Sequence, residues 1–165
     1  MWRQAVAKKL KGFATQKFGV GLILMNKLNP DEIWIIEEQI AKPWLGKRKH
    51  DWSIPMETTE AGESSNQCFS RLLVEELGEE IMVTSPKLLI PQVIIKKVGF
   101  LRLFTAKATI TDLPQPLDPE VLPVGWKPWE DLLNLPNLRL GMEQILRYYF
   151  LGQRQGGQGD IIFVD

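Results

Sequence analysis

The segment from Ser64 to Gly78 constrains the fold most, because it has the pattern of one amphipathic helix with defined ends. Ser64 and Ser65 are good helix N-caps, and Gly78 is placed to end or loosen the helix, with residues 79–82 as an open continuation. The apolar residues recur at the three- and four-residue spacings of a helix with one buried face: Phe69, Leu72, Leu73 and Leu77. We therefore predict a helix that packs this face against a core.

Strand-like segments lie on both sides of the predicted helix. Those before it are the two arms of a hairpin and a shorter strand, at residues 18–25, 32–36 and 52–55. Those after it are two longer strands, a short extended segment and a terminal strand, at residues 88–95, 98–110, 124–126 and 161–164. A proline-rich loop, a helical turn and a final amphipathic helix complete the order, at residues 113–123, 129–133 and 138–150. This order predicts an α/β (α+β) sandwich, a mixed β-sheet flanked by helices.

Length and composition limit the organisation of the chain. Its 165 residues suit one domain, and we expect a basic arm at 1–17, the domain at 18–151, and a Gly/Gln-rich linker with a terminal strand at 152–165. The formal net charge is zero, which argues against nucleic acid as a partner. No apolar run reaches the roughly 18 residues of a membrane helix, and no secretory leader is visible. With Cys68 as the single cysteine, a reducing cytoplasm is the expected location.

Acidic residues gather around the predicted helix. Between positions 57 and 80 there are seven glutamates and one basic residue, Arg71. A block of this kind either repels itself in solvent or recruits a cation. A solvated helix face is the simpler reading of such a charge run when it stands alone.

The spacing of these acids matches a known pattern. Glu63 precedes Arg71 by seven intervening residues, and an apolar residue, two adjacent acids and a glycine follow at Leu73, Glu75, Glu76 and Gly78. Trp52 and Pro55 lead into the segment, and Glu120 lies six residues before Trp126. In these features residues 18–150 resemble the Nudix hydrolase family. The resemblance implies the Nudix fold and metal-dependent cleavage of a pyrophosphate bond, with Mg²⁺ or Mn²⁺ as cofactor.

Three positions depart from the family's motif. Glu57 stands where the family has a glycine, Leu72 where it has a metal-binding glutamate, and Glu79 where it has an apolar residue. Positions 72, 75 and 76 share one helix face, where three carboxylates would make a site of hard oxygen ligands for Mg²⁺. Leucine at 72 leaves two carboxylates on that turn, so the metal site is predicted to be weakened.

The resemblance and these departures together give a set of candidate residues. We expect Glu75, Glu76 and Glu120 to form the metal site, with help from Glu57 or Glu79. The candidate catalytic residues are Glu76, Glu120, Arg71 and Glu63, with Glu120 as a ligand or base. Arg71 and Glu63 are expected to contact each other and to shape the loop that carries Glu63. Leu72 is read as an additional core residue.

Two functions remain open from the sequence. The first is a hydrolase that cleaves a nucleoside diphosphate linked to another group, with weakened activity. The second is a catalytically lapsed module of the same fold that binds a nucleotide or a protein. A pure interaction protein that uses the basic arm and the tail is a third, weaker reading. The terminal strand could join the sheet of its own chain or that of a partner, so a homodimer is an open expectation.

Other reactive or aromatic residues have simple structural readings. His50 is expected to be exposed in a basic loop and Cys68 to be packed on the helix. Trp34 and Trp52 are expected in the core. Three tryptophans are candidates either for core packing or for stacking on a nucleobase: Trp44, Trp126 and Trp129. A basic loop could face phosphates or simply be solvated, with slight preference for the second reading: Lys42, Lys47, Arg48 and Lys49.

Overall fold

The computed structural model describes residues 17–78, 83–108, 114–152 and 161–164. The strands are β1 (Lys17–Asn26), β2 (Glu32–Glu38), β3 (Trp52–Ser53), β4 (Met56–Thr58), β5 (Val83–Ile95), β6 (Gly99–Ala108), β7 (Val121–Pro128) and β8 (Ile161–Val164). The helices are the 3-10 turn η1 (Pro43–Leu45) and the α-helices α2 (Ser65–Leu77), α3 (Trp129–Leu132) and α4 (Met142–Leu151). The predicted helix, its end at Gly78 and the hairpin before it are all present.

The described strands form one mixed sheet in the order β3-β2-β1-β6-β5-β8, with β4 on β1 and β7 on β2. β1 runs parallel to β6 along its whole length, from Lys17 beside Gly99 to Asn26 beside Ala108. β5 is antiparallel to β6, and β8 is parallel to β5. The terminal strand therefore pairs with the sheet of its own chain, which is one of the two arrangements expected from the sequence.

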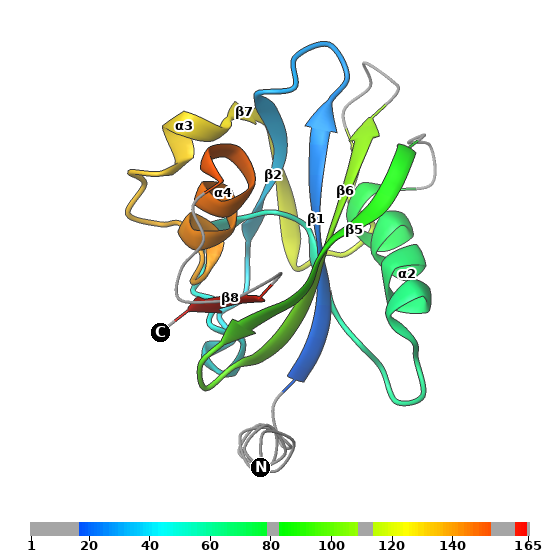
Figure 1. The fold of residues 1–165 in the computed structure, drawn as a ribbon. Helices are drawn as coiled ribbons and strands as arrows, with labels where there is room; N and C mark the ends of the chain where they lie inside the picture. The colour runs from blue at the N-terminus through cyan, green and yellow to red at the C-terminus, as the bar shows by residue number, and fades with distance from the viewer. Residues whose placement is uncertain (1–16, 79–82, 109–113, 153–160, 165) are drawn as a thin grey trace, which may run out of the picture.

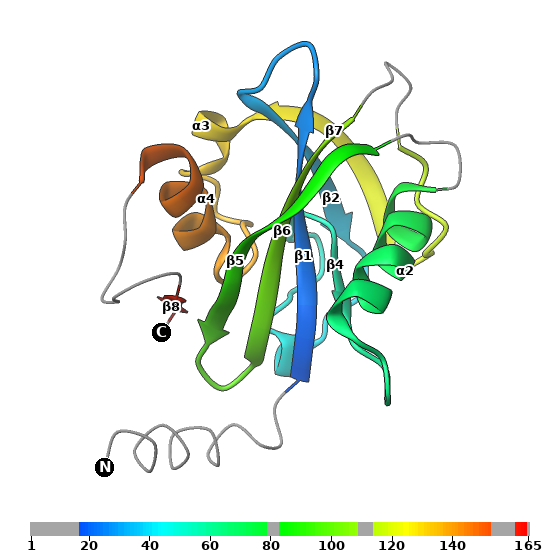
Figure 2. The same ribbon diagram turned by 45° about the vertical axis from the view of Figure 1, so that its right-hand side comes forward.

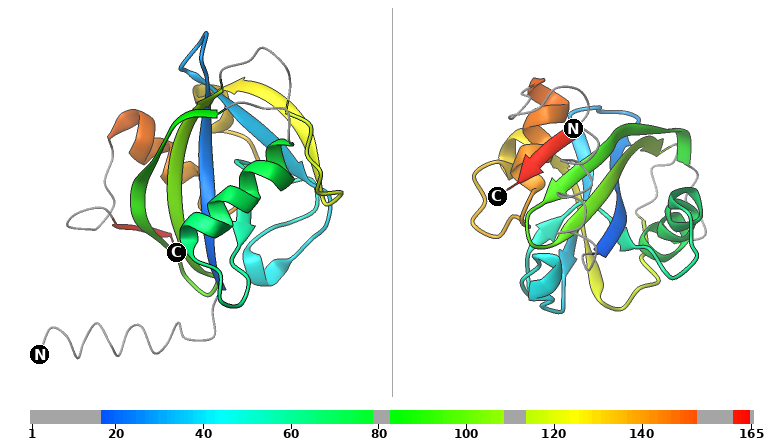
Figure 3. Two further views of the ribbon diagram at one scale, coloured as in Figure 1. Left: turned by 90° about the vertical axis from the view of Figure 1, so that its right-hand side faces the viewer. Right: turned by 60° about the horizontal axis from the view of Figure 1, so that its bottom comes forward.

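Helices cover both faces of the sheet. Figure 1 shows α2 on one side of β1 and β6, with α3 and α4 on the other, and Figure 2 shows the same separation from a second direction. In the left view of Figure 3, α2 crosses in front of the sheet. The predicted sandwich is confirmed. Within the described ranges, no helix has the length and apolar character needed to cross a membrane.

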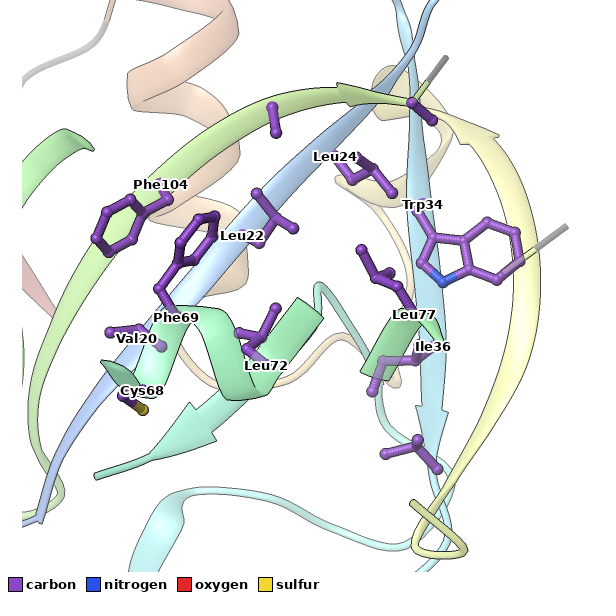
Figure 4. Packing of buried hydrophobic residues seen from close by; sticks show 13 residues of the cluster. Val20, Leu22, Leu24, Trp34, Ile36, Cys68, Phe69, Leu72, Leu77 and Phe104 are labelled. Atoms are coloured by element: carbon purple, nitrogen blue, oxygen red, sulfur yellow. The ribbon is translucent and has the colours of Figure 1, made fainter. Parts of the chain in front are cut away.

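Each face of the sheet has its own hydrophobic cluster. Alternate residues of β1 point to opposite faces, so Leu22 packs toward α2 and Ile23 toward α4. Leu72 of α2 is completely buried in the first cluster and, in Figure 4, lies among the side chains of Leu22 and Phe69. The reading of Leu72 as a core residue is confirmed. Trp34 is also buried in this cluster, as expected.

The short strand β4 was not predicted, and it depends on a close approach to β1. Thr58 of β4 pairs with Gly19 of β1, and Glu57 pairs with Val20. A Cβ atom built at Gly19 would lie 2.7 Å from the Glu57 carbonyl oxygen, so only glycine permits this spacing. Strands β5 and β7 are also longer than predicted, since each pairs with a neighbour beyond the segment with strand-like composition.

Candidate metal centre

Helix α2 is held at its N-terminus by a reciprocal cap. The Ser64 hydroxyl accepts a hydrogen bond from the Gln67 backbone N–H at 3.1 Å, and the Gln67 side chain accepts one from the Ser64 N–H at 2.9 Å. The helix then presents its buried face to the sheet. Glu76 lies on this buried side with 2% of its surface exposed, one turn after the fully buried Leu72. A carboxylate is therefore fixed at the edge of the core.

The C-terminus of α2 is capped by the proline-rich loop. The backbone N–H groups of Leu117 and Asp118 donate to the Glu75 carbonyl oxygen at 2.7 and 3.1 Å, and that of Gln115 donates to the Leu77 carbonyl oxygen at 3.2 Å. These contacts satisfy carbonyls that a helix end leaves without partners. They also bring the Asp118 side chain to the end of the helix that carries Glu76.

Gly78 makes this approach of the loop feasible. Its φ is +83°, a left-handed value that favours glycine, and a Cβ atom there would lie 2.5 Å from the Gln115 carbonyl oxygen. A side chain at this position would push the loop away from the helix.

Three carboxylates from three different elements meet beside α2. Glu57 comes from β4, Glu76 from α2 and Asp118 from the loop, and one carboxylate oxygen of each lies within 4.8 Å of the other two. Glu57 Oε1 and Glu76 Oε2 are buried, and neither has a hydrogen-bond partner in the described part of the chain. Buried polar atoms without partners are rare and costly, so these two oxygens call for a ligand. Hard carboxylate oxygens fit Mg²⁺ or Mn²⁺.

The electrostatics of the cluster agree with this reading. Burial raises the pKa of the Glu57 carboxyl from 4.5 to about 7, and the neighbouring Glu75 carboxyl adds to the rise. Burial also raises the pKa of Glu76, to about 9, with further contributions from Glu57 and Asp118. The protein alone therefore resists full ionisation of the cluster, and a divalent cation would remove that resistance.

Arg71 connects the acids on the other side of Glu57. Its Nε and Nη2 donate to the two Glu63 carboxylate oxygens at 3.0 and 3.1 Å, which is the predicted Arg71–Glu63 contact. Nη1 donates to Glu57 Oε2 at 3.0 Å and to Glu75 Oε2 at 3.1 Å. The guanidinium lowers the pKa of Glu63 to about 2. Arg71 thus fixes the loop before the helix and holds Glu57 Oε2, while Glu57 Oε1 is buried without a hydrogen-bond partner among the described residues.

The cluster lies in the wall of a pocket of about 560 Å³. The lining includes six acids, namely Glu38, Glu57, Glu75, Glu76, Asp118 and Glu120. The cationic lining residues are Lys42, Lys47 and Arg139. Apolar residues complete the lining, among them Phe18, Met56, Ile95, Val98, Phe100 and Leu101. The excess of acids means that an anionic ligand needs added positive charge to enter the pocket.

The cationic residues of the pocket are all paired. Glu38, which is 2% exposed, accepts from Lys47 Nζ at 3.0 Å and from Arg139 Nη1 at 3.1 Å. Burial lowers the pKa of Arg139, while Glu38 opposes the shift. Lys42 Nζ pairs with Glu120 Oε2 at 2.6 Å, and this contact lowers the pKa of Glu120.

The structure arranges the predicted site residues differently from the expected set. It brings Glu57 and Glu76 together, directs Glu75 to Arg71 and pairs Glu120 with Lys42. Glu79 lies outside the described residues. Asp118 was missed, although an acid two residues before Glu120 in a proline-rich loop was a visible signal.

The remaining candidates take mostly structural positions. The His50 side chain is largely exposed and lies 3.3 Å from Glu37 Oε2, and Cys68 is buried on α2. Trp129 stacks on Phe150, Trp126 packs edge-on against Trp34, and Trp44 is exposed. The pocket is lined by none of these three tryptophans, and by only Lys42 and Lys47 of the basic loop.

The chain resembles known proteins in sequence pattern and in fold. A family model described as the NUDIX domain matches residues 15–149. Among curated proteins, none matches the chain. Solved structures do match, at 15–21% identity, which shows the fold alone.

Three of these structures illustrate the likeness. One, from work on MutT of Aliivibrio salmonicida and Vibrio cholerae, is 21% identical, with a TM-score of 0.59 over 82% of this chain and 96% of that one. The NUDIX domain of Shewanella oneidensis NrtR, complexed with ADP ribose, is 18% identical, with a TM-score of 0.58 over 84% and 89%. An ADP-ribose pyrophosphatase from Streptococcus suis is 15% identical, with a TM-score of 0.57 over 90% and 99%.

Proposed function

This chain belongs to the NUDIX domain family, and we propose that it is a metal-dependent hydrolase that cleaves a diphosphate bond in a nucleotide-type substrate. The observation that carries the proposal is the trio Glu57, Glu76 and Asp118, which has two buried oxygens without hydrogen-bond partners. Their donor chemistry fits Mg²⁺ or Mn²⁺. An ion held there would neutralise charge on a bound diphosphate and would activate a water for attack on phosphorus.

Glu57 supplies the carboxylate that the helix lacks. Position 72 carries a leucine whose side chain is buried in the core, so the helix offers Glu76 to the cluster and Glu75 to Arg71. Glu57 stands at the motif position where glycine is usual, and its free oxygen faces Glu76. A carboxylate moved from the helix to the adjoining strand preserves the number of acids at the site.

The chain's own residues have distinct tasks in this proposal. Glu57, Glu76 and Asp118 hold the ion, and Arg71 orients Glu57 through Oε2. Glu75 lies beside the trio, where its partly exposed carboxylate can accept a proton from an attacking water. The apolar lining residues of the pocket offer contacts to the organic part of the substrate.

Two relatives suggest the class of substrate. The Shewanella domain is described in complex with ADP ribose, and the Streptococcus protein is described as an ADP-ribose pyrophosphatase. Both identities are low, so they guide the choice of test compounds. A pocket of about 560 Å³ is within the usual range for small-molecule sites.

The test is a turnover assay on the full chain with ADP-ribose, dinucleoside polyphosphates, nucleotide sugars and nucleoside triphosphates, plus Mg²⁺ or Mn²⁺. We expect slow turnover that Glu76→Gln and Asp118→Asn abolish and that chelation removes. Glu143→Gln, at an exposed acid of α4, is the control for loss of one charge. Turnover that survives both site variants would overturn the assignment of the trio.

A binding module is the second candidate, and Leu72 favours it, because the helix has lost one of the acids that the family uses. In that case the same panel should stabilise the protein thermally without being converted. Mn²⁺ binding with no product after long incubation would support this reading over the hydrolase.

A further inference from the structure

The Lys42–Glu120 pair lines the same pocket as the carboxylate trio, and neither residue belongs to the trio. The Glu120 backbone N–H donates to Asp118 Oδ1 at 2.9 Å. Glu120 therefore pairs with Lys42 through its side chain and orients Asp118 of the trio through its backbone. The Glu120 side chain turns to Lys42 Nζ at 2.6 Å. A positive charge is thereby fixed beside the proposed metal centre.

Lys42 differs from the other cations of the pocket in its accessibility. Lys47 and Arg139 share the buried carboxylate of Glu38, and their side chains are each 10% exposed. The Lys42 and Glu120 side chains are 27% and 32% exposed, so an entering anion can reach the Lys42 ammonium. An ammonium carries three donor hydrogens, and one ion pair with Glu120 leaves donor capacity for a phosphate.

The backbone around Lys42 is preset for this role. Lys42 and Lys47 form an isolated antiparallel bridge that closes the short turn η1. The Gly46 N–H donates to the Pro43 carbonyl oxygen at 3.0 Å, and the Gln39 N–H donates to the Glu120 carbonyl oxygen at 2.8 Å. The segment that leads into Lys42 is thus tied to the loop that carries Glu120, which reduces the entropy lost when Lys42 binds a ligand.

We propose that Lys42 binds one of the two phosphates of the substrate, the one farther from the metal. Glu120 is then a positioning residue that holds Lys42 in place. This inference rests on the proposed diphosphate chemistry. It replaces a role for Glu120 as metal ligand or base with a role in aligning the substrate, because its carboxylate faces Lys42 and its backbone serves Asp118. The cation also offsets part of the acidic excess of the pocket.

The experiment measures binding of methylenediphosphonate, an uncleavable diphosphate, to the full chain with Mn²⁺ by calorimetry. Mn²⁺ affinity alone is measured in parallel. Lys42→Gln should weaken diphosphonate binding by about tenfold to a hundredfold, since a hydrogen bond to a charged group is lost, with Mn²⁺ affinity unchanged. Lys42→Arg should restore most of the affinity. Lys49→Gln, at an exposed lysine outside the pocket, is the matched control and should bind like the parent.

Glu120→Gln distinguishes a residue that positions Lys42 from a residue that binds the metal. We expect unchanged Mn²⁺ affinity, weaker diphosphonate binding, and no additional loss when it is combined with Lys42→Gln. A fall in Mn²⁺ affinity for Glu120→Gln would overturn the positioning role. Lys42→Gln with parental diphosphonate affinity would overturn the Lys42 assignment and leave the metal centre standing. A parent chain that binds neither Mn²⁺ nor diphosphonate would overturn both this inference and the proposed function.

Discussion

Glu57 and Glu76 face each other across the junction of β4 and α2, each with a buried carboxylate oxygen that no described donor reaches. Ionising both without a cation costs free energy, and the pKa values of about 7 and about 9 express that cost. The two side chains therefore connect the stability of the fold to pH, and a cation bound as proposed would change that dependence.

The first prediction concerns pH in the absence of metal. Glu57 and Glu76 bind more protons in the folded than in the unfolded chain at pH values between about 4.5 and 9. Their contribution to stability is therefore fully present below pH 4.5 and is lost as the pH rises through the folded values. Glu76→Gln should melt at a higher temperature than the parent at pH 8, and the difference should narrow at pH 5.

Differential scanning fluorimetry at the two pH values checks this prediction, with Mn²⁺ added in a second series. The ion should raise the melting temperature of the parent at pH 8 and leave that of Glu76→Gln almost unchanged. An equal difference between the two proteins at both pH values would count against a buried, costly charge at Glu76.

The second prediction concerns Leu72, which is buried against Leu22 and Phe69. Leu72→Ala should lower the free energy of unfolding by about 2–5 kcal/mol, the usual range for deleting a buried leucine side chain. Leu72→Glu restores the residue of the family's motif, yet it should destabilise the protein further, because it places a charge in the core. Urea denaturation measures both effects. A stable Leu72→Glu protein with tighter Mn²⁺ binding would show that this position can still serve the metal.

The third prediction concerns the hydrogen bonds of the Arg71 guanidinium group. Lysine cannot reproduce the two-point contact with Glu63 and the third contact with Glu57. Arg71→Lys should therefore lower the free energy of unfolding by about 1.5–3 kcal/mol and should weaken Mn²⁺ binding, because Glu57 loses its orientation. Arg147→Lys, at an ion pair on α4, is the control and should change neither quantity appreciably.

The fourth prediction compares two glycines that both have a positive φ. Gly78 and Gly62 have φ values of +83° and +77°, but a Cβ atom meets the Gln115 carbonyl at Gly78 and nothing within 4 Å at Gly62. Alanine is strained at both positive φ values, and the ψ of 169° at Gly78 places that residue in a region adopted essentially by glycine alone. Gly78→Ala alone should displace the loop that carries Asp118 and so weaken Mn²⁺ binding in calorimetry. Equal Mn²⁺ affinities in the two variants would indicate that the loop does not depend on Gly78.

Local patterns in the sequence were enough to predict much of the fold. The spacing of Phe69 and Leu72 predicted the buried face of α2, and Ser64 and Gly78 marked its ends. The contact between Arg71 and Glu63 was also foreseen, because the family resemblance fixes both residues by their spacing. These features depend on neighbours in the chain or on one motif, which a single sequence displays directly.

The composition of the carboxylate trio depends on contacts between distant segments. Asp118 joins it because backbone N–H groups of its loop donate to the carbonyl oxygens of Glu75 and Leu77. The spacing of apolar and charged residues in the sequence gives no sign of these contacts. Glu57 joins it because Gly19 lets β4 approach β1. Glu120 lies close in sequence to the site, but the ion pair with Lys42 turns its side chain elsewhere, and that pairing spans residues far apart in the chain.

Cys68 is the chain's one thiol, and its side chain is buried between α2 and β4, with Sγ 3.7 Å from the Glu57 carbonyl oxygen. Burial raises its pKa to about 12, so alkylating reagents should modify it only when the helix separates from β4. The rate of alkylation thus measures how often α2 separates from β4. Comparing this rate with and without an added ion would show how far ion binding stabilises the contact between the two elements, without any engineered probe.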